Sequence, residues 1–164
     1  MRTEKGRRIR DRLLLNGPGI GKLMRLVVVE RFCRALSALV QAGVPLPDAV
    51  TVSAESTGNL VVQDRIIEAK EAMVRGDGLA GPLAATELFP SGANQMIRVG
   101  ETTGTLDEQL DFAAQFYARE VDYRLKKFTD LFEPAVIVFM GLIVGFVAVA
   151  LVSAMYGVFN QVEL

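Results

Sequence analysis

A long stretch without charge constrains the fold of this chain more than any other feature. No Asp, Glu, Lys or Arg occurs from Pro134 to Val162, and the central part, Ala135–Met155, reads AVIVFMGLIVGFVAVALVSAM. About 20 apolar residues cross the hydrocarbon core of a bilayer, and an uncharged run well beyond about 18 residues is typical of a transmembrane helix. A buried core helix is the alternative interpretation. We expect one membrane-spanning helix over residues 134–159.

The charges that flank this stretch predict its orientation. Four basic residues precede it closely, and Glu163 is the only charged residue after it. The preceding basic residues are Arg119, Arg124, Lys126 and Lys127. Because positive residues stay on the cytoplasmic side of a membrane, we expect residues 22–133 in the cytoplasm. Residues 160–164 should then form a short tail outside. The single cysteine, Cys33, allows no intrachain disulfide, which suits a reducing compartment.

The N-terminal segment, residues 1–21, is predicted to be a basic juxtamembrane linker. Its first twelve residues contain six Lys or Arg residues against Glu4 and Asp11. A solvated tail is one interpretation. The other is a segment that lies on anionic lipid headgroups, where each basic residue contributes about 1 kcal/mol. The whole chain has a net charge of −1, which argues against a nucleic-acid-binding protein.

Helical periodicity dominates the residues between the linker and the expected span. Apolar residues recur at helical spacing over about 22–42, 47–56, 60–75, 91–99 and 106–132, with a short helical turn near 79–85. The connections between these segments are short, which favours antiparallel packing of neighbouring helices. We therefore predict an all-α fold, in which residues 22–133 form an antiparallel bundle of about six helices. One transmembrane helix follows the bundle.

Glycine and proline mark the first helix–helix turn and the end of the bundle. Gly43 lies where a helix C-terminus favours a left-handed residue, and Pro45 follows it. At the other end, Glu133 precedes Pro134, a residue pair that predicts a boundary or kink before the membrane span.

The second turn lies in the sequence IRVGETTGTLDEQL, residues 97–110. Gly100 is expected to end one helix and Gly104 to precede the next, each with a positive φ that glycine adopts cheaply. Thr105 and Glu108 have the spacing of a capping box, so a helix should begin at Leu106. The stretch is therefore predicted to be a turn between two helices.

Several chemical functions are disfavoured. The chain has no histidine, the most common general base and metal ligand. Cys33 lies in a helical segment and is interpreted as a small core residue. The sequence NGPGIGKL, residues 16–23, lacks the first glycine and the hydroxyl residue of a phosphate-binding loop. We predict neither catalysis nor a cofactor.

Two further groups of residues are candidates for contacts. Acidic residues near the second turn have the oxygen ligands that a hard cation prefers, although helix capping and solvation explain them as well. These residues are Glu101, Asp107, Glu108 and Asp111. Gly141 and Gly145 form a GxxxG pair that lets two membrane helices approach closely. Arg98 and Glu101 are predicted either to pair or to face a partner.

Three motifs in colinear order give the chain a specific resemblance. They are RFCRALSALVQAGVPLPDAV, then FP with MIRVGETTGTLDEQL, then EP with MGLIVGF. Together they resemble the inner-membrane platform family of type II secretion systems and type IV pili, over residues 6–159. Members of that family usually carry two copies of this domain and three membrane spans. This chain resembles the second copy with the final span, so the resemblance implies a fragment or the product of a split gene.

The resemblance also implies a function in which the chain catalyses no reaction. Such platforms lie in the bacterial inner membrane and are expected to couple a hexameric cytoplasmic ATPase to the extraction and assembly of pilins or pseudopilins. The implied partners are membrane lipid, that ATPase, other inner-membrane platform proteins, the (pseudo)pilins and further copies of the chain, with no nucleic acid. The alternative function is a single-pass membrane adaptor or receptor whose bundle binds another cytoplasmic partner. A membrane-anchored enzyme is the third and least supported hypothesis.

Overall fold

The structure is a computed structural model of the whole chain, and it describes residue 11 and residues 20–162. Within these residues, the side chains at 20, 128, 131–133, 135 and 152–162 are left undescribed. The described residues form helices and turns without any strand, which confirms the all-α prediction. The chain divides into two compact units, residues 1–122 and 123–164.

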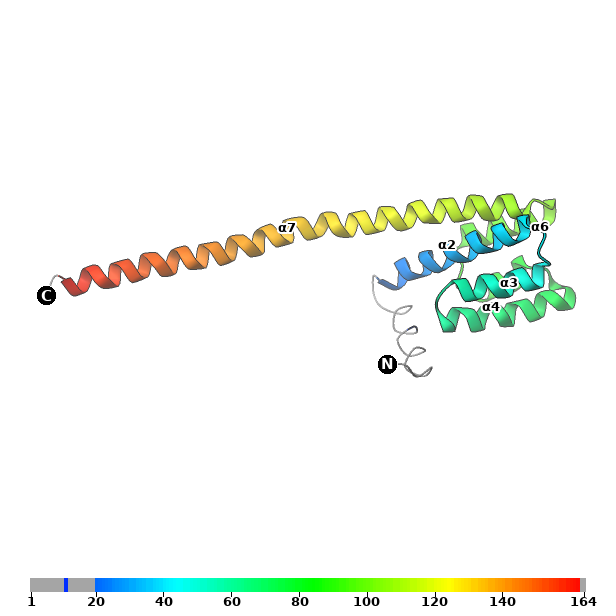
Figure 1. Cartoon of the computed structure of the whole chain (residues 1–164), viewed down its shortest axis with the longest axis horizontal. Helices are drawn as coiled ribbons and strands as arrows, with labels where there is room; N and C mark the ends of the chain where they lie inside the picture. Colours follow the sequence, from blue (N-terminus) through cyan, green and yellow to red (C-terminus); the bar gives the residue numbers. More distant parts are fainter. Residues whose placement is uncertain (1–10, 12–19, 163–164) are drawn as a thin grey trace. The chain divides into compact units, whose positions relative to one another are not determined.

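The first unit is built around α2 (Figure 1). Its elements are α2 (Ile20–Gln41), α3 (Leu46–Ser56), α4 (Leu60–Ala72), a π-helical turn η1 (Met73–Asp77), α5 (Ala80–Ala85), α6 (Ser91–Thr103) and the first part of α7 (Leu106–Val162). Successive helices contact one another from α2 to α6, and η1 contacts both α4 and α5. The hydroxyl of Ser37 on α2 donates to the backbone oxygen of Asp107 at 2.9 Å, which ties α2 to the start of α7.

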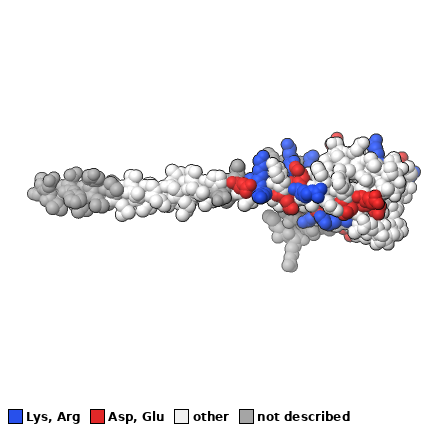
Figure 2. All heavy atoms as spheres, turned by 90° about the horizontal axis from the view of Figure 1, so that it is seen from above, with Lys and Arg blue, Asp and Glu red and all other residues white. Residues whose placement is uncertain are grey.

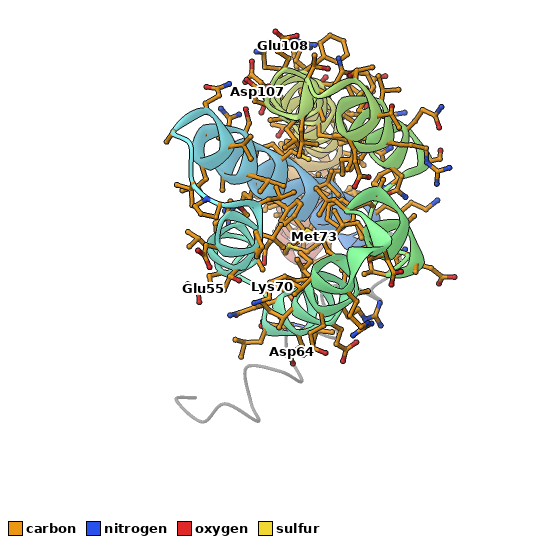
Figure 3. All side chains as sticks on the ribbon, turned by 90° about the vertical axis from the view of Figure 1, so that its right-hand side faces the viewer. Glu55, Asp64, Lys70, Met73, Asp107 and Glu108 are labelled. Carbon is orange, nitrogen blue, oxygen red and sulfur yellow. The ribbon has the colours of Figure 1, made fainter. Side chains whose placement is uncertain are left out.

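The core follows the predicted helical stripes. Phe32 and Leu36 of α2 are fully buried, as are Ile66 of α4 and Leu110 of α7. The ring of Phe32 packs edge-on against that of Phe89, with the centroids 5.1 Å apart. The end-on view also shows Met73 directed into the bundle, while Asp107 and Glu108 lie at its surface (Figure 3).

Local sequence signals explain where α2 ends and α4 begins. Gly43 has a φ of 76°, and its N–H and that of Val44 donate to the oxygens of Val40 and Leu39. This pair of bonds closes the helix as a Schellman motif and confirms the prediction for Gly43. Pro45 then precedes α3. At the start of α4, the Asn59 side chain accepts from the N–H of Val62 at 3.1 Å and so caps the helix.

The predicted end of the helix near residue 99 was wrong, and of the two alternatives at Pro134, a boundary or a kink, the boundary was wrong. Helix α6 continues beyond residue 99 to Thr103, so Gly100 lies inside the helix. Helix α7 does not end before Glu133 but continues through Pro134 to Val162. A proline removes one backbone donor and clashes with the preceding turn, yet the turns on either side of it can keep their own hydrogen bonds.

The second unit consists of α7 from Tyr123 onward. In the part of the chain that the structure describes, no helix is found that is both long and apolar enough to span a membrane. The expected span over 134–159 lies partly outside the described side chains, and it stays a prediction. Between Val136 and Leu151 no described side chain is charged, and the large apolar ones are exposed, from 45% for Ile143 to 77% for Phe146. The same stretch shows neither acidic nor basic spheres in Figure 2.

Candidate functional site

The corner between α6 and α7 brings together most of the residues that the sequence singled out. Gly104 ends α6 with a φ of 74° and a ψ of 14°, the left-handed conformation that was predicted for it. Helix α7 begins at Leu106, also as predicted, with the N–H of Gln109 donating to the oxygen of Thr105 at 3.1 Å. The stretch is therefore a helix–helix turn. Its residues also contact the first turn of α7 and the start of α5.

Gly100 has a different role from the one predicted. It is buried inside α6 and does not have a positive φ. A Cβ atom added to it would lie 2.8 Å from the Cα of Leu106 and 3.1 Å from the Cβ of Gln109. Contacts this short force the backbone to move. Gly100 is therefore required because the first turn of α7 packs directly against it.

Glu101 joins α6 to α5, which lies about twenty residues earlier in the chain. Its two carboxylate oxygens accept the backbone N–H groups of Leu79 and of Ala80, the latter at 2.9 Å. Leu79 and Ala80 are almost fully buried, at 2% and 4% exposure. Since the first N–H groups of a helix have no partner within that helix, a carboxylate here satisfies donors that would otherwise be lost.

Gly78 completes this contact and was missed as a site residue. Its φ is 71°, and a Cβ on it would lie 2.6 Å from a carboxylate oxygen of Glu101. The glycines of Gly76–Asp77–Gly78 are typical of a helix end, but this sequence contains no signal for a partner on α6. Only the tertiary contact identifies Glu101 as the cap of α5.

The predicted capping box does not form among the described residues. The hydroxyl of Thr105 pairs with the hydroxyl of Thr103 at 2.7 Å, and no bond joins Thr105 and Glu108 side chains to each other's backbone. The two threonines flank the left-handed Gly104, so their hydroxyls lie close together and compete with the cap. Threonine side chains thus bond locally at this corner, and Glu108 remains exposed.

Arg98 and Glu101 do not pair, because the Glu101 carboxylate is bonded to the backbone of α5. Arg98 lies exposed on α6. No group of three acidic, cysteine or histidine side chains suited to a metal ion occurs in the described residues. Asp111 instead accepts from the side chain of Gln115 at 2.8 Å, so the structure does not bring Glu101, Asp107 and Asp111 together as ligands.

Cys33 has the environment of a core residue. It is fully buried, and this burial, with a smaller effect of the charge of Glu30, raises the pKa of its thiol to about 12. The reactive form of cysteine is the thiolate, so a raised pKa makes this side chain a poor nucleophile.

Two exposed apolar features are available for contacts. On α7, Phe112 and Phe116 lie one turn apart and are 54% and 44% exposed. The sequence analysis missed these two residues because it followed the apolar residues of the buried face of α7, which is opposite to them. The signal that could have identified them is the i, i+4 spacing of two aromatic residues. In the second unit, Gly141 and Gly145 lie in a shallow apolar groove on α7, together with Leu142 and Phe146.

Comparisons with known proteins agree with this architecture. Residues 32–154 match the family described as type II secretion system (T2SS), protein F. The chain is 42% identical over 144 residues to the type IV pilus assembly protein PilC of Myxococcus xanthus. It is 36% identical over 163 residues to the PilC of Thermus thermophilus, and 32% identical over 138 residues to the type II secretion system protein F of Pseudomonas aeruginosa.

These alignments cover 88%, 99% and 84% of this chain but only 34%, 40% and 34% of the three relatives. The chain therefore spans about a third to two fifths of the length of the relatives it matches. The match to the family model extends over most of the chain, and the chain belongs to the type II secretion protein F family. The resemblance drawn from the three motifs is thereby confirmed.

The packing role of Gly100 predicts a specific response to mutation. Gly100→Ala should destabilise the bundle by about 1–3 kcal/mol through overpacking, and Gly100→Asn should be no better tolerated. At Gly104, where an added Cβ meets nothing, Gly104→Ala should cost about 1 kcal/mol and Gly104→Asn less, because asparagine tolerates the left-handed conformation. Urea unfolding followed by circular dichroism measures all four. A rescue by asparagine at position 100 would contradict the packing explanation.

Because Glu101 caps α5, we predict that Glu101→Gln weakens the hydrogen bonding at the start of α5 and leaves the other helices unchanged. Glutamine has a single acceptor oxygen and no charge, so one of the two N–H groups loses its partner, at about 1 kcal/mol. Hydrogen exchange at the amides of Leu79 and Ala80 should accelerate several-fold, while amides in α2 keep their protection. Glu108→Gln on the exposed face of α7 is the matched control. Equal exchange at Leu79 in both variants would refute the cap.

Proposed function

We propose that the chain is an inner-membrane platform component of a type II secretion or type IV pilus assembly machine. The single observation that carries the proposal is the family match over residues 32–154, which includes both the bundle and the apolar stretch of α7. Relatives of this chain are named for pilus assembly and for type II secretion. The proposed role requires the chain to bind and to transmit movement, and no reaction is assigned to it.

The membrane anchor in this proposal is residues 134–159. A helix that is apolar on all sides is stable when it is buried in protein or in lipid. The exposed apolar side chains from Val136 to Leu151 support lipid as that environment. The GxxxG pair of Gly141 and Gly145 would then be a contact with another membrane helix, either of a second copy or of a partner platform protein. The basic residues before the anchor support a cytoplasmic bundle, with the C-terminus outside.

The proposed coupling starts at the corner between α6 and α7. Helix α7 contributes to both units, and its first turn is packed on Gly100 and bonded to Ser37. Glu101 connects the same corner to α5. A cytoplasmic ATPase that docks on the bundle could therefore displace α7 through these contacts. Pilin or pseudopilin extraction would be the result of that movement.

The exposed aromatic pair is the proposed docking point for the ATPase. Aromatic residues are enriched at binding hot spots, where truncation costs about 2 kcal/mol or more. The full chain, purified in mild detergent from its own host, should carry the hexameric assembly ATPase with it. Phe112→Ala with Phe116→Ala should reduce the recovered ATPase at least tenfold, while Val74→Ala, at a side chain 64% exposed, should leave it unchanged. Recovery of a different cytoplasmic protein without the ATPase would favour the adaptor alternative.

The anchor has a separate test. A charged residue at the centre of a membrane helix costs about 2.5–3.5 kcal/mol on insertion scales. Val144→Arg should therefore shift the chain from the carbonate-washed membrane fraction to the soluble or aggregated fraction. Val52→Arg on α3 is the matched control, because Val52 is also exposed, at 49%. Full membrane retention of the Val144→Arg chain would count against the proposed anchor.

A further inference from the structure

Helix α5 contacts both α4 and α6, but its bonds to α6 are the stronger ones. At the start of α5, the Glu101 carboxylate of α6 accepts from the N–H groups of Leu79 and Ala80. In the link that follows α5, the backbone oxygen of Phe89 accepts from the side-chain amide of Asn94 on α6, at 3.2 Å. Hydrogen bonds to an ionised carboxylate are roughly twice as strong as neutral ones. Helices α5 and α6 are therefore joined at both ends of α5.

A cleft of about 470 Å³ lies between α5 and α4. The apolar side chains that line it are all small, so no large side chain of one helix fits between those of the other there. These residues are Ala69 and Ala72 of α4 and Pro82 and Ala85 of α5. Across the cleft, the guanidinium of Arg65 lies 3.5 Å from the backbone oxygen of Thr86, which is longer than the usual range of about 2.7–3.2 Å. Helix α5 is therefore held less firmly on α4 than on α6.

The connection from α4 to α5 contains two glycines with different surroundings. Gly76 has a φ of 105° and interrupts the regular backbone of η1, and a Cβ atom on it would meet no atom within 4 Å. Gly78 has a φ of 71°, and the Glu101 carboxylate packs directly against it. Hinges are a few loop or element-terminal residues, often small ones, that absorb a change in φ and ψ. Gly76 therefore has the properties of a hinge, while Gly78 is held by α6.

We propose that α5 and α6 move together against α4, by rotation of the backbone at Gly76. The Glu101 carboxylate keeps α5 on α6 during this movement, and the cleft between α4 and α5 changes its width. The long contact between Arg65 and Thr86 is the bond that opens. One consequence rests on the proposed function: a displacement of the corner between α6 and α7 would reach α5 through Glu101. The hinge itself requires no partner, so it can be tested separately.

Distances between pairs of spin labels on the full chain in nanodiscs test the hinge without a partner. Labels are attached at exposed positions, in a background where Cys33→Ala removes the native thiol. One pair joins α4 to α5 and the other joins α5 to α6: Glu71→Cys with Gly81→Cys, and Gly81→Cys with Arg98→Cys. We expect the α4–α5 distance distribution to be wider than the α5–α6 distribution. Equal widths would overturn the proposal, and this comparison needs no further substitution.

Two variants with matched controls then test the role of each residue. Glu101→Gln should broaden the α5–α6 distribution to the width of the α4–α5 distribution, and Glu108→Gln should leave it unchanged. Gly76→Ala should shift the α4–α5 distance, because alanine disfavours a positive φ. Gly43→Ala should not shift it, although Gly43 is also left-handed and an added Cβ meets nothing there. Joint movement is overturned if Glu101→Gln changes nothing, and the hinge is overturned if the two glycine variants shift the distance equally or not at all.

Discussion

Burial of the apolar face of α2 is the interaction on which the bundle depends. Phe32, Cys33 and Leu36 are completely removed from solvent, and each large apolar side chain contributes roughly 1.5–3 kcal/mol when fully buried. The other elements of the first unit pack on or close to this helix, so their positions follow from its faces. The buried thiol of Cys33 belongs to this packing, and the same burial makes it a poor nucleophile.

The corner between α6 and α7 shows how a short motif serves three contacts at once. Gly100 allows the backbone of α7 to pack closely against α6, Gly104 turns the chain between the two helices, and Glu101 caps α5. Each contact uses a different property of its residue: the absence of a side chain, the freedom of φ, and a pair of acceptor oxygens. The proposed role is to transmit movement. A corner that joins several helices suits this role, because a displacement of one helix then shifts the others.

Outside the bundle, charge and apolarity divide the chain into regions with different environments. The charged side chains that the structure describes belong to residues 11–130, and the stretch from Val136 to Leu151 has none (Figure 2).

The helices, their buried faces, the turns at Gly43 and Gly104 and the family could all be predicted from the amino-acid sequence. These features depend on neighbours within a few residues, which periodicity and local hydrogen bonding encode. Three features could not be predicted and became visible only in the folded chain: the close packing at Gly100, the bonds from Leu79 and Ala80 to Glu101, and the bonds of Asp11 to the start of α4. In the last two cases the partners lie about twenty and nearly fifty residues apart in sequence. At Gly100 the deciding fact is a packing distance between two helices, which no local pattern specifies.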